Sequence, residues 1–268
     1  MSLSSDKISP SKIKDGLHSL SFIKEVHYYQ KTESTNVIAK NLAAEGAEEG
    51  TVVITDEQVK GRGRLGRTWV SPSGTNILMS VIFRPELEVS KIFSLTMLAS
   101  LAVVKAITNT TGLHSHIKWP NDIYSKNKKI GGILTEFNTD HGNVTFAVVG
   151  IGLNVNFNPS WYPEIKDSAT SIFLRLGRKV SRVKLIQSIL GQIDEIYRML
   201  KNGKRREIYK EWIGYSLIIG RRVTIISSEV IEEGIVDCIH EDGRLVLRRD
   251  NGEKIEVLHG DVSLRLTQ

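Results

Sequence analysis

The densest group of chemically active residues lies between residues 58 and 69, which read QVKGRGRLGRTW. Glycines and arginines alternate in this stretch: Gly61, Arg62, Gly63, Arg64, Gly66 and Arg67. Glycine lets backbone N–H groups approach an anion closely, and arginine adds a forked, permanently charged donor for phosphate or carboxylate. A loop so charged, and so poor in apolar anchors, should be ordered mainly by its ligand. We interpret it as a clamp for an anion.

The clamp sequence has a second interpretation, a flexible arginine–glycine segment that binds RNA or DNA through phosphates. It is neither a Walker P-loop, because no Gly-Lys-Ser/Thr follows, nor a Rossmann fingerprint. The charge distribution favours a local anion site. Of the net charge of +6, residues 60–67 carry +4 and residues 118–129 carry +3, so the rest of the chain is close to neutral.

A second segment, residues 118–124 (KWPNDIY), places an amide and a carboxylate after a Trp-Pro pair. Asp122 is a candidate for holding Mg²⁺ together with a nucleotide, and Asn121 for binding a ligand or its own turn. A plain turn is the alternative. Shortly after it, Lys129 stands at the mouth of a predicted strand and is followed by Gly131 and Gly132. Its ammonium suits a carboxylate or an α-phosphate, and the alternative is a solvated hairpin tip.

The elements that must position these residues follow from hydrophobic periodicity. Helices are predicted from Ser34 or Thr35 to Ala44, where one of these hydroxyls is the N-cap, and over 92–107, 182–200 and 204–213. Strands are predicted over 51–55, 77–83, 116–118, 121–124, 130–138 and 144–155, with a hairpin turn at 140–143. The chain before Ser34 reads as irregular. This order predicts an α+β fold in which helices back a mixed β-sheet.

The last part of the chain changes character at about Ser216. Short alternating strands follow, separated by the turn sequences EDG at 241–243 and DNG at 250–252. We therefore predict two domains, residues 1–215 and a small β-barrel over residues 216–268 that docks on the first because its own core is marginal. Cys238 alternates with apolar neighbours, which predicts a buried strand thiol.

Composition excludes several classes of protein. The apolar stretch over residues 95–106 is interrupted by polar residues and is too short to cross a bilayer, so we expect no membrane span. The first residues lack the apolar core of a secretory signal, which makes the cytoplasm the expected location. A single cysteine excludes an internal disulfide.

In combination, the motifs resemble biotin–protein ligases in their order and approximate spacing. The matching segments are Ser34-Thr35-Asn36, Gly61 to Trp69, Ser71-Pro72-x-Gly74-x-Asn76, Lys118 to Asp122, Lys129 to Leu134 and Gly150-Ile151-Gly152-Leu153-Asn154. With the barrel-like tail, the similarity covers roughly residues 30–266. It implies a class II synthetase-like biotin/lipoate ligase catalytic domain with an SH3-like barrel. The implied activity is adenylation of biotin with ATP and transfer of biotin to a lysine.

The resemblance also implies a role for each candidate residue. Biotin would be bound by Ser34, Thr35, Asn36, Gln58, Gly61, Arg62, Gly63, Arg64, Lys129 and Gly132. ATP would be bound by Arg64, Arg67, Trp69, Lys118, Asn121 and Asn154. Arg62, Lys129 and Asp122 would act in catalysis, Asp122 by orienting Mg²⁺ or the lysine.

The implied acceptor is a biotin carboxyl carrier protein, and a homodimer is possible within the family. About thirty residues precede Ser34, too few for the DNA-binding domain of bifunctional members, so we expect no DNA binding. Leu65 stands where some relatives carry arginine, which should weaken the hold on the adenylate. Two rivals remain: a lipoate or octanoate ligase or transferase of related fold, and a basic nucleic-acid-binding module whose affinity falls with salt.

Overall fold

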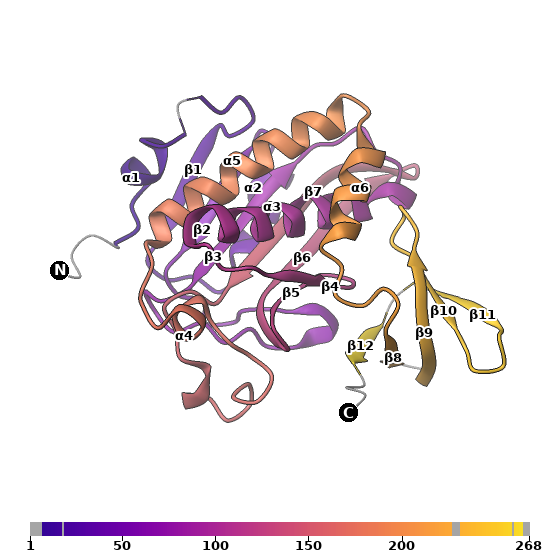
Figure 1. Ribbon diagram of the computed structural model, residues 1–268. Helices are drawn as coiled ribbons and strands as arrows, with labels where there is room; N and C mark the ends of the chain where they lie inside the picture. Colours follow the sequence, from indigo (N-terminus) through magenta and orange to yellow (C-terminus); the bar gives the residue numbers. More distant parts are fainter. Residues whose placement is uncertain (1–6, 18, 227–230, 259, 265–268) are drawn as a thin grey trace.

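The main body of the molecule is a seven-stranded mixed sheet (Figure 1). The computed structural model describes residues 7–17, 19–226, 231–258 and 260–264. The strand order is β1 (Glu25–Tyr29), β2 (Thr51–Thr55), β3 (Ile77–Phe83), β7 (Asn143–Leu153), β6 (Lys128–Asp140), β5 (Asp122–Ser125), β4 (His116–Lys118). Strands β1 and β2 pair in parallel, and every other pair is antiparallel. This architecture confirms the predicted α+β fold.

Strand β1 is an element that the sequence did not reveal. Val26 is its one buried residue, so the strand has almost no apolar alternation to detect. A second missed element, helix α1 (Pro10–Lys14), precedes it and buries Ile13. Among the described residues before Ser34, these two elements replace the predicted irregular start, and α1 packs against α5 and β1.

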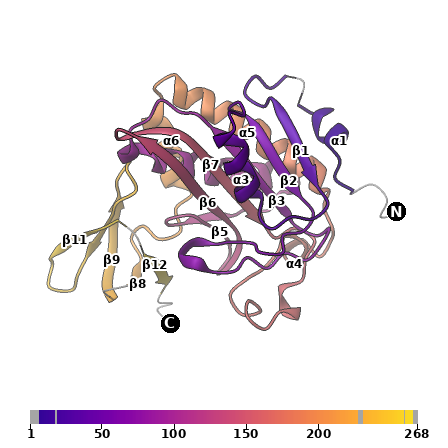
Figure 2. The ribbon, with the colours of Figure 1, turned by 180° about the vertical axis from the view of Figure 1, so that it is seen from behind.

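Helices cover both faces of the sheet, and alternate residues of β2 show which face each helix occupies. Val53 packs with helix α2 (Thr35–Ala44), whereas Val52 and Ile54 belong to the larger core with α3 (Phe93–Thr111) and α5 (Arg182–Lys201). In Figure 1, α3 and α5 cross in front of the strands, and Figure 2 shows the sheet from behind. All three predicted core helices are confirmed, as is α6 (Arg205–Gly214).

The segment Val89–Thr111, which contains helix α3, is long and apolar enough to cross a membrane by length and composition alone. Its surroundings account for that hydrophobicity. Most of this segment is buried inside the protein, where α3 packs on α5, α6 and the sheet. The apolar residues of α3 therefore form the centre of the core.

A second, five-stranded antiparallel sheet follows α6, with the order β11 (Lys254–Val257), β10 (Leu245–Arg248), β9 (Ile231–Ile239), β8 (Arg222–Ile226), β12 (Asp261–Leu264). The two predicted turns connect β9 to β10 and β10 to β11. The first turn also joins the sheets, because Trp119 Nε1 donates to the Gly243 carbonyl at 2.8 Å. A Cβ on Gly243 would lie 2.5 Å from the Phe93 ring, so this turn sits directly on α3.

The prediction for Cys238 was wrong, because this thiol is exposed. The cause is a break in the β9–β10 register: Val246 pairs with Cys238 and Leu247 with Val236, which leaves Asp237 as an extra residue. Such a bulge reverses the alternation after it, so that Val236 and Ile239 both point inward.

Candidate active site

One cavity of about 930 Å³ gathers the chemically active residues at one end of the main sheet. This volume is near the upper limit of the range for small-molecule sites. The predicted residues that line it are Ser34, Thr35, Asn36, Gln58, Arg62, Gly63, Arg64, Arg67, Trp69, Lys118, Asn121, Asp122, Lys129, Gly132 and Asn154. Gly61 alone among the candidates lies outside the lining. It sits behind the clamp, where a Cβ would come within 2.6 Å of the Trp69 carbonyl oxygen.

Lys129 and Asp122 form an ion pair in the cavity wall, with 2.6 Å between Nζ and Oδ1. They lie on neighbouring strands, β6 and β5, and both side chains are roughly a quarter to a third exposed. Gly132 lies beside them, and a Cβ there would lie 3.3 Å from Lys129 Cε and 3.4 Å from Asp122 Oδ1. The glycine leaves room for the ion pair, which keeps a cation pointed at whatever anion enters.

The clamp has more internal structure than its sequence suggested. Gly63 N–H donates to the Arg67 carbonyl at 2.7 Å and Trp69 N–H donates to the Gly61 carbonyl at 2.9 Å, which closes a small hairpin. At its tip Leu65 adopts φ 54°, a left-handed conformation that is unfavourable for a branched side chain. Leu65 is also 69% exposed. The hairpin therefore presents its side chains on a defined backbone.

The clamp reaches the opposite wall through Arg64. Its Nη1 donates to Asn121 Oδ1 at 3.1 Å. Asn121 is itself fixed to β6, because its Nδ2 donates to the Ile133 carbonyl at 2.6 Å and its carbonyl accepts from Ile133 N–H. The Asn121 amide is thus a bridge between strand and clamp.

The wall around Thr35 is assembled from buried hydroxyls and amides. Gln58 Oε1 accepts from Thr35 N–H at 2.8 Å and from its Oγ1 at 3.1 Å. Ser80, fully buried on β3, lies 2.7 Å from Thr35 Oγ1 and 2.6 Å from Asn36 Oδ1. Ser34 occupies the N-cap position of helix α2, but its hydroxyl makes no capping hydrogen bond, so the predicted side-chain cap is not formed.

Both polar atoms of the Asn36 side chain are hydrogen-bonded to protein groups. Its Nδ2 donates to Glu136 Oε2 at 2.8 Å and to the Leu134 carbonyl at 3.2 Å, while its Oδ1 accepts from Ser80. Glu136 also accepts from Lys40 at 2.8 Å. Burial raises the pKa of Glu136, but the hydrogen bonds from Lys40 and Asn36 and the charges of Lys40 and Arg62 outweigh burial, so the pKa lies below its ordinary value. This carboxylate anchors Asn36.

Two glycines of β7 explain the Gly-Ile-Gly-Leu-Asn motif. A Cβ on Gly150 would lie 2.2 Å from Asn36 Oδ1, and a Cβ on Gly152 would lie 2.7 Å from the Trp69 ring. Alternate residues of a strand share a face, so both glycines open the cavity side of β7. The Trp69 Nε1 is buried and has no partner among the described residues. Lys129 Nζ lies 5.6 Å from the centre of the same ring.

Asn154, two residues further along the motif, points into a hydrogen-bond network beneath the cavity. Its Nδ2 donates to the Thr170 carbonyl at 3.1 Å, and its Oδ1 lies 3.5 Å from Asn76 Nδ2. Asn154 and Asn36 are each only 4% exposed. Their amides are committed to protein partners, so both residues shape the wall.

Several residues that line the cavity lie outside the sequence motifs and could not be identified from them. Glu164, Ile165, Ser168 and Ala169 come from the loop after β7, and Ile226 and Val262 come from the second sheet. Lys129 fixes the loop, because its N–H donates to the Ser168 carbonyl at 2.9 Å and its carbonyl accepts from Thr170 N–H at 2.7 Å. Ser80 was missed because it is a single polar residue within an apolar strand, and Glu136 because it is one of several polar residues in the second half of β6.

The described residues contain no group of three or more His, Cys, Asp and Glu side chains that could hold a metal ion. The cavity has two carboxylates, Asp122 and Glu164, and the first of them is paired with Lys129. Mg²⁺ usually keeps water ligands and binds through one or two carboxylates plus substrate phosphates. The residues present fit an ion that arrives with a nucleotide and do not form a dedicated protein cage.

Comparisons with known proteins agree with this geometry. Residues 27–154 match the biotin/lipoate A/B protein ligase family, and residues 218–265 match the biotin protein ligase C-terminal domain. The bifunctional ligase/repressor BirA of Bacillus subtilis is 37% identical over 96% of this chain and 79% of its own length. The biotin–[acetyl-CoA-carboxylase] ligase of Mycobacterium tuberculosis is 31% identical over 89% of this chain and 88% of its own.

A solved structure gives the same result. The biotin protein ligase from Aquifex aeolicus in complex with biotin and ATP superimposes with a TM-score of 0.77 and 30% identity, over 91% of this chain and 99% of that one.

Proposed function

Because the chain belongs to the biotin protein ligase family, we propose that its cavity converts biotin and ATP into biotinyl-5′-adenylate and then passes biotin to a lysine. The chain is a ligase, and biotin and ATP are its substrates. The main observation in support of this cavity as the active site is the Lys129–Asp122 ion pair. It places a cation in the same cavity as the clamp arginines and the Trp69 ring.

The first step joins two anions, so it requires neutralisation and alignment. An oxygen of the biotin carboxylate attacks the α-phosphorus of ATP, and pyrophosphate leaves. We assign Arg62 and Lys129 to the charge that develops around this phosphorus. Asp122 keeps Lys129 oriented, since its Oδ1 is 2.6 Å from the ammonium. Mg²⁺ belongs to this proposal as a companion of the ATP phosphates, where it supplies further neutralisation.

The two substrates divide the cavity. Biotin lies on the side of Ser34, Thr35, Gln58, Arg62, Gly63 and Gly132, and ATP lies on the side of Arg64, Arg67, Trp69, Lys118 and Asn121. The Trp69 Nε1, which has no hydrogen-bond partner in the described part of the chain, supports the second assignment, because a buried donor without a partner costs free energy until a ligand accepts from it. Asn36 and Asn154 support the walls through neighbours instead of contacting substrate directly.

The second step needs no protein nucleophile. The amine of an acceptor lysine attacks the activated carbonyl, an amide forms, and AMP leaves. A clamp over the mixed anhydride limits hydrolysis while the lysine enters. The acceptor in this proposal is a biotin carboxyl carrier protein.

Further parts of the proposal concern organisation and location. We place the domain boundary between residues 215 and 216, supported by the two separate sheets and by the match over residues 218–265. A homodimer could form through β1, because this strand lies at one edge of the main sheet. The described residues ahead of Ser34 form one five-residue helix and one strand, which is not a helix-turn-helix, so they should not bind DNA. The cytoplasm remains the expected location.

The test is biotin-dependent exchange of labelled pyrophosphate into ATP with Mg²⁺. We expect exchange in the wild type and a loss of at least about 100-fold in Arg62→Ala and in Lys129→Ala. Lys60→Ala and Lys128→Ala are matched controls, since they remove the same charge from residues outside the cavity lining and should keep near-wild-type exchange.

A lipoate ligase is the second candidate, because the matching family model covers both kinds of enzyme. Running the exchange with lipoate or octanoate in place of biotin separates the two. Exchange with lipoate alone would overturn the proposal in favour of this candidate. Absence of exchange with either acid would overturn both.

A further inference from the structure

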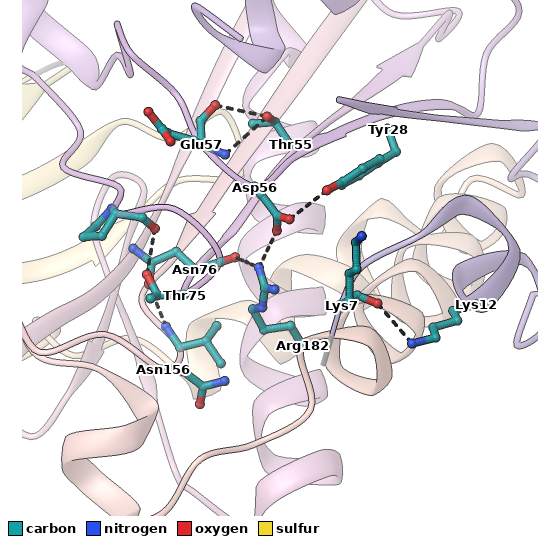
Figure 3. Close-up of polar contacts among 12 residues, drawn as sticks. Lys7, Lys12, Tyr28, Thr55, Asp56, Glu57, Thr75, Asn76, Asn156 and Arg182 are labelled. Atoms are coloured by element: carbon teal, nitrogen blue, oxygen red, sulfur yellow. Dashed lines mark hydrogen bonds and ion pairs between the residues drawn. The ribbon is translucent and has the colours of Figure 1, made fainter. Parts of the chain in front are cut away.

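A buried ion pair between Asp56 and Arg182 lies outside the cavity lining. Figure 3 shows the pair together with Tyr28 and Asn76. Arg182, the first residue of α5, donates from Nη1 to Asp56 Oδ1 at 2.7 Å. The two side chains are only 4% and 13% exposed. The other carboxylate oxygen accepts from the Tyr28 hydroxyl at 2.7 Å. A pair so deeply buried is costly unless its geometry is well satisfied, so its position in the fold requires an explanation.

The pair stands where the clamp loop leaves and re-enters the sheet. Asp56 directly follows β2, and Asn76 directly precedes β3, so these two residues are the roots of the loop. The same Arg182 Nη1 also lies 3.3 Å from the Asn76 carbonyl oxygen. Next to it, Gly74 N–H donates to the Asp56 carbonyl at 3.1 Å. One guanidinium therefore fastens both roots.

Each root leads directly to one side of the cavity. Asp56 is two residues before Gln58, whose Oε1 accepts from Thr35. Asn76 Oδ1 accepts from Val155 N–H at 3.2 Å, and its Nδ2 reaches Asn154 Oδ1. A displacement of one root relative to the other would move Gln58 against Asn154.

We propose that Arg182 is a positioning residue of the ligase reaction, which holds the two roots of the clamp at a fixed separation so that the clamp closes over the adenylate on a rigid base. This inference rests on the proposed function. It does not require Arg182 to touch substrate. Burial, followed by the hydrogen bond to Asp56, raises the pKa of Tyr28 to about 12, so its hydroxyl remains a donor to Asp56 at physiological pH.

The proposal predicts which property fails when Arg182 is removed. Arg182→Met leaves Asp56 without its cation and should destabilise the protein. In Arg182→Met combined with Asp56→Asn, no buried charge is left unpaired, so folding should recover while the side-chain link between the two roots stays broken. We expect both variants to lose preformed biotinyl-adenylate at least tenfold faster than the wild type, and the KM for biotin to rise by a similar factor.

Two further variants separate positioning from general stability. Asp194→Asn removes another buried carboxylate of α5, which accepts from Phe22 N–H at 2.6 Å, twelve residues and about 18 Å further along the helix. It should lower the thermal midpoint without faster loss of adenylate. Arg182→Lys keeps the charge but loses the planar fork, so its rate of adenylate loss should lie between those of the wild type and the double variant.

The experiment loads each full-length protein with labelled biotin and ATP, removes free ligand by gel filtration and follows the label retained with time. Retention by the wild type that requires ATP establishes that adenylate forms, so a failed proposed function is recognised before any variant is compared. The positioning role is overturned if the double variant retains adenylate as long as Asp194→Asn and keeps the wild-type KM for biotin. Faster loss in the double variant and in Arg182→Lys, with Asp194→Asn unchanged, supports it.

Discussion

The clamp hairpin of residues 61–69 is held by a few backbone hydrogen bonds and by the hydrogen bond from Arg64 to Asn121, and it exposes Leu65 at its tip. The wall behind it is held by buried side chains, among which Ser80 and Asn36 are committed to fixed partners. The difference indicates that the rear wall is preorganised, whereas the clamp adapts to its ligand. Substitutions in the rear wall should therefore change binding and stability together, whereas substitutions at the tip should change only ligand retention.

Gly150→Ala should have the largest effect, because it strikes the preorganised wall. The new methyl group would lie 2.2 Å from Asn36 Oδ1, an atom that cannot move without breaking its hydrogen bond from Ser80. We expect kcat/KM for biotin to fall roughly 100-fold, together with a lower thermal midpoint. Steady-state kinetics and thermal unfolding measure both. Gly191→Ala, in an open position on α5, is the matched control, and equal behaviour of the two would contradict a rigid rear wall.

Glu136→Gln should have an intermediate effect that depends on pH. The folded-state pKa of Glu136 lies below its ordinary value, so the carboxylate contributes stability above its unfolded pKa and loses it as pH falls through the folded pKa. We expect a loss of about 1 kcal/mol in the free energy of unfolding at pH 7. The difference from the wild type should shrink below about pH 4.

Denaturant unfolding at several pH values, together with biotin titration at pH 7, checks this prediction. Biotin affinity should weaken several-fold, because the partner of Asn36 loses its charge. Glu88→Gln is the control: its pKa is also lowered, first by the hydrogen bond from Lys91, but Glu88 lies on the surface away from the cavity and should not change biotin affinity. A difference between Glu136→Gln and the wild type that does not vary with pH would refute the proposed anchor.

Leu65→Arg should have the smallest effect, and only on the adaptive wall. An added guanidinium at the clamp tip should bind the phosphate of the adenylate and slow its loss by about threefold. The free energy of unfolding should not change measurably. Val59→Arg makes the same change of charge at an exposed position outside the cavity lining and should leave retention unchanged. If both variants slow release equally, general electrostatic attraction is the cause, and Leu65 has no specific role.

The sequence predicted most of the fold because the relevant signals are local. The apolar periodicity of residues 182–200 and the glycine-containing turns at 241–243 and 250–252 each depend on a few neighbours. The motifs were also recognisable as a set, since the Arg-Gly stretch and the Lys-Trp-Pro-Asn-Asp segment carry unusual residue combinations. Strand β1 was missed because it buries one residue only.

The supporting contacts of the site could not be predicted, because they join residues far apart in the chain. Ser80 acts on Asn36 from 44 positions away, and Arg182 reaches Asp56 across 126. In sequence, Arg182 is simply a cation at the start of an amphipathic helix, where exposure to solvent is the usual outcome. Cys238 shows a related effect, since a bulge that depends on the partner strand reversed its expected side.

The hydrogen bond from Trp119 to Gly243 bears on how the two halves of such an enzyme can be exchanged. Trp119 belongs to the cavity lining, yet the partner of its indole nitrogen comes from the second sheet, and Gly243 has no side chain because the Phe93 ring occupies that space. A chimaera that combines the first 215 residues with the tail of a relative must preserve a glycine, a carbonyl and a ring at one junction. The two halves should therefore evolve as a matched pair, and this turn is the first place to inspect when a graft between relatives folds but does not work.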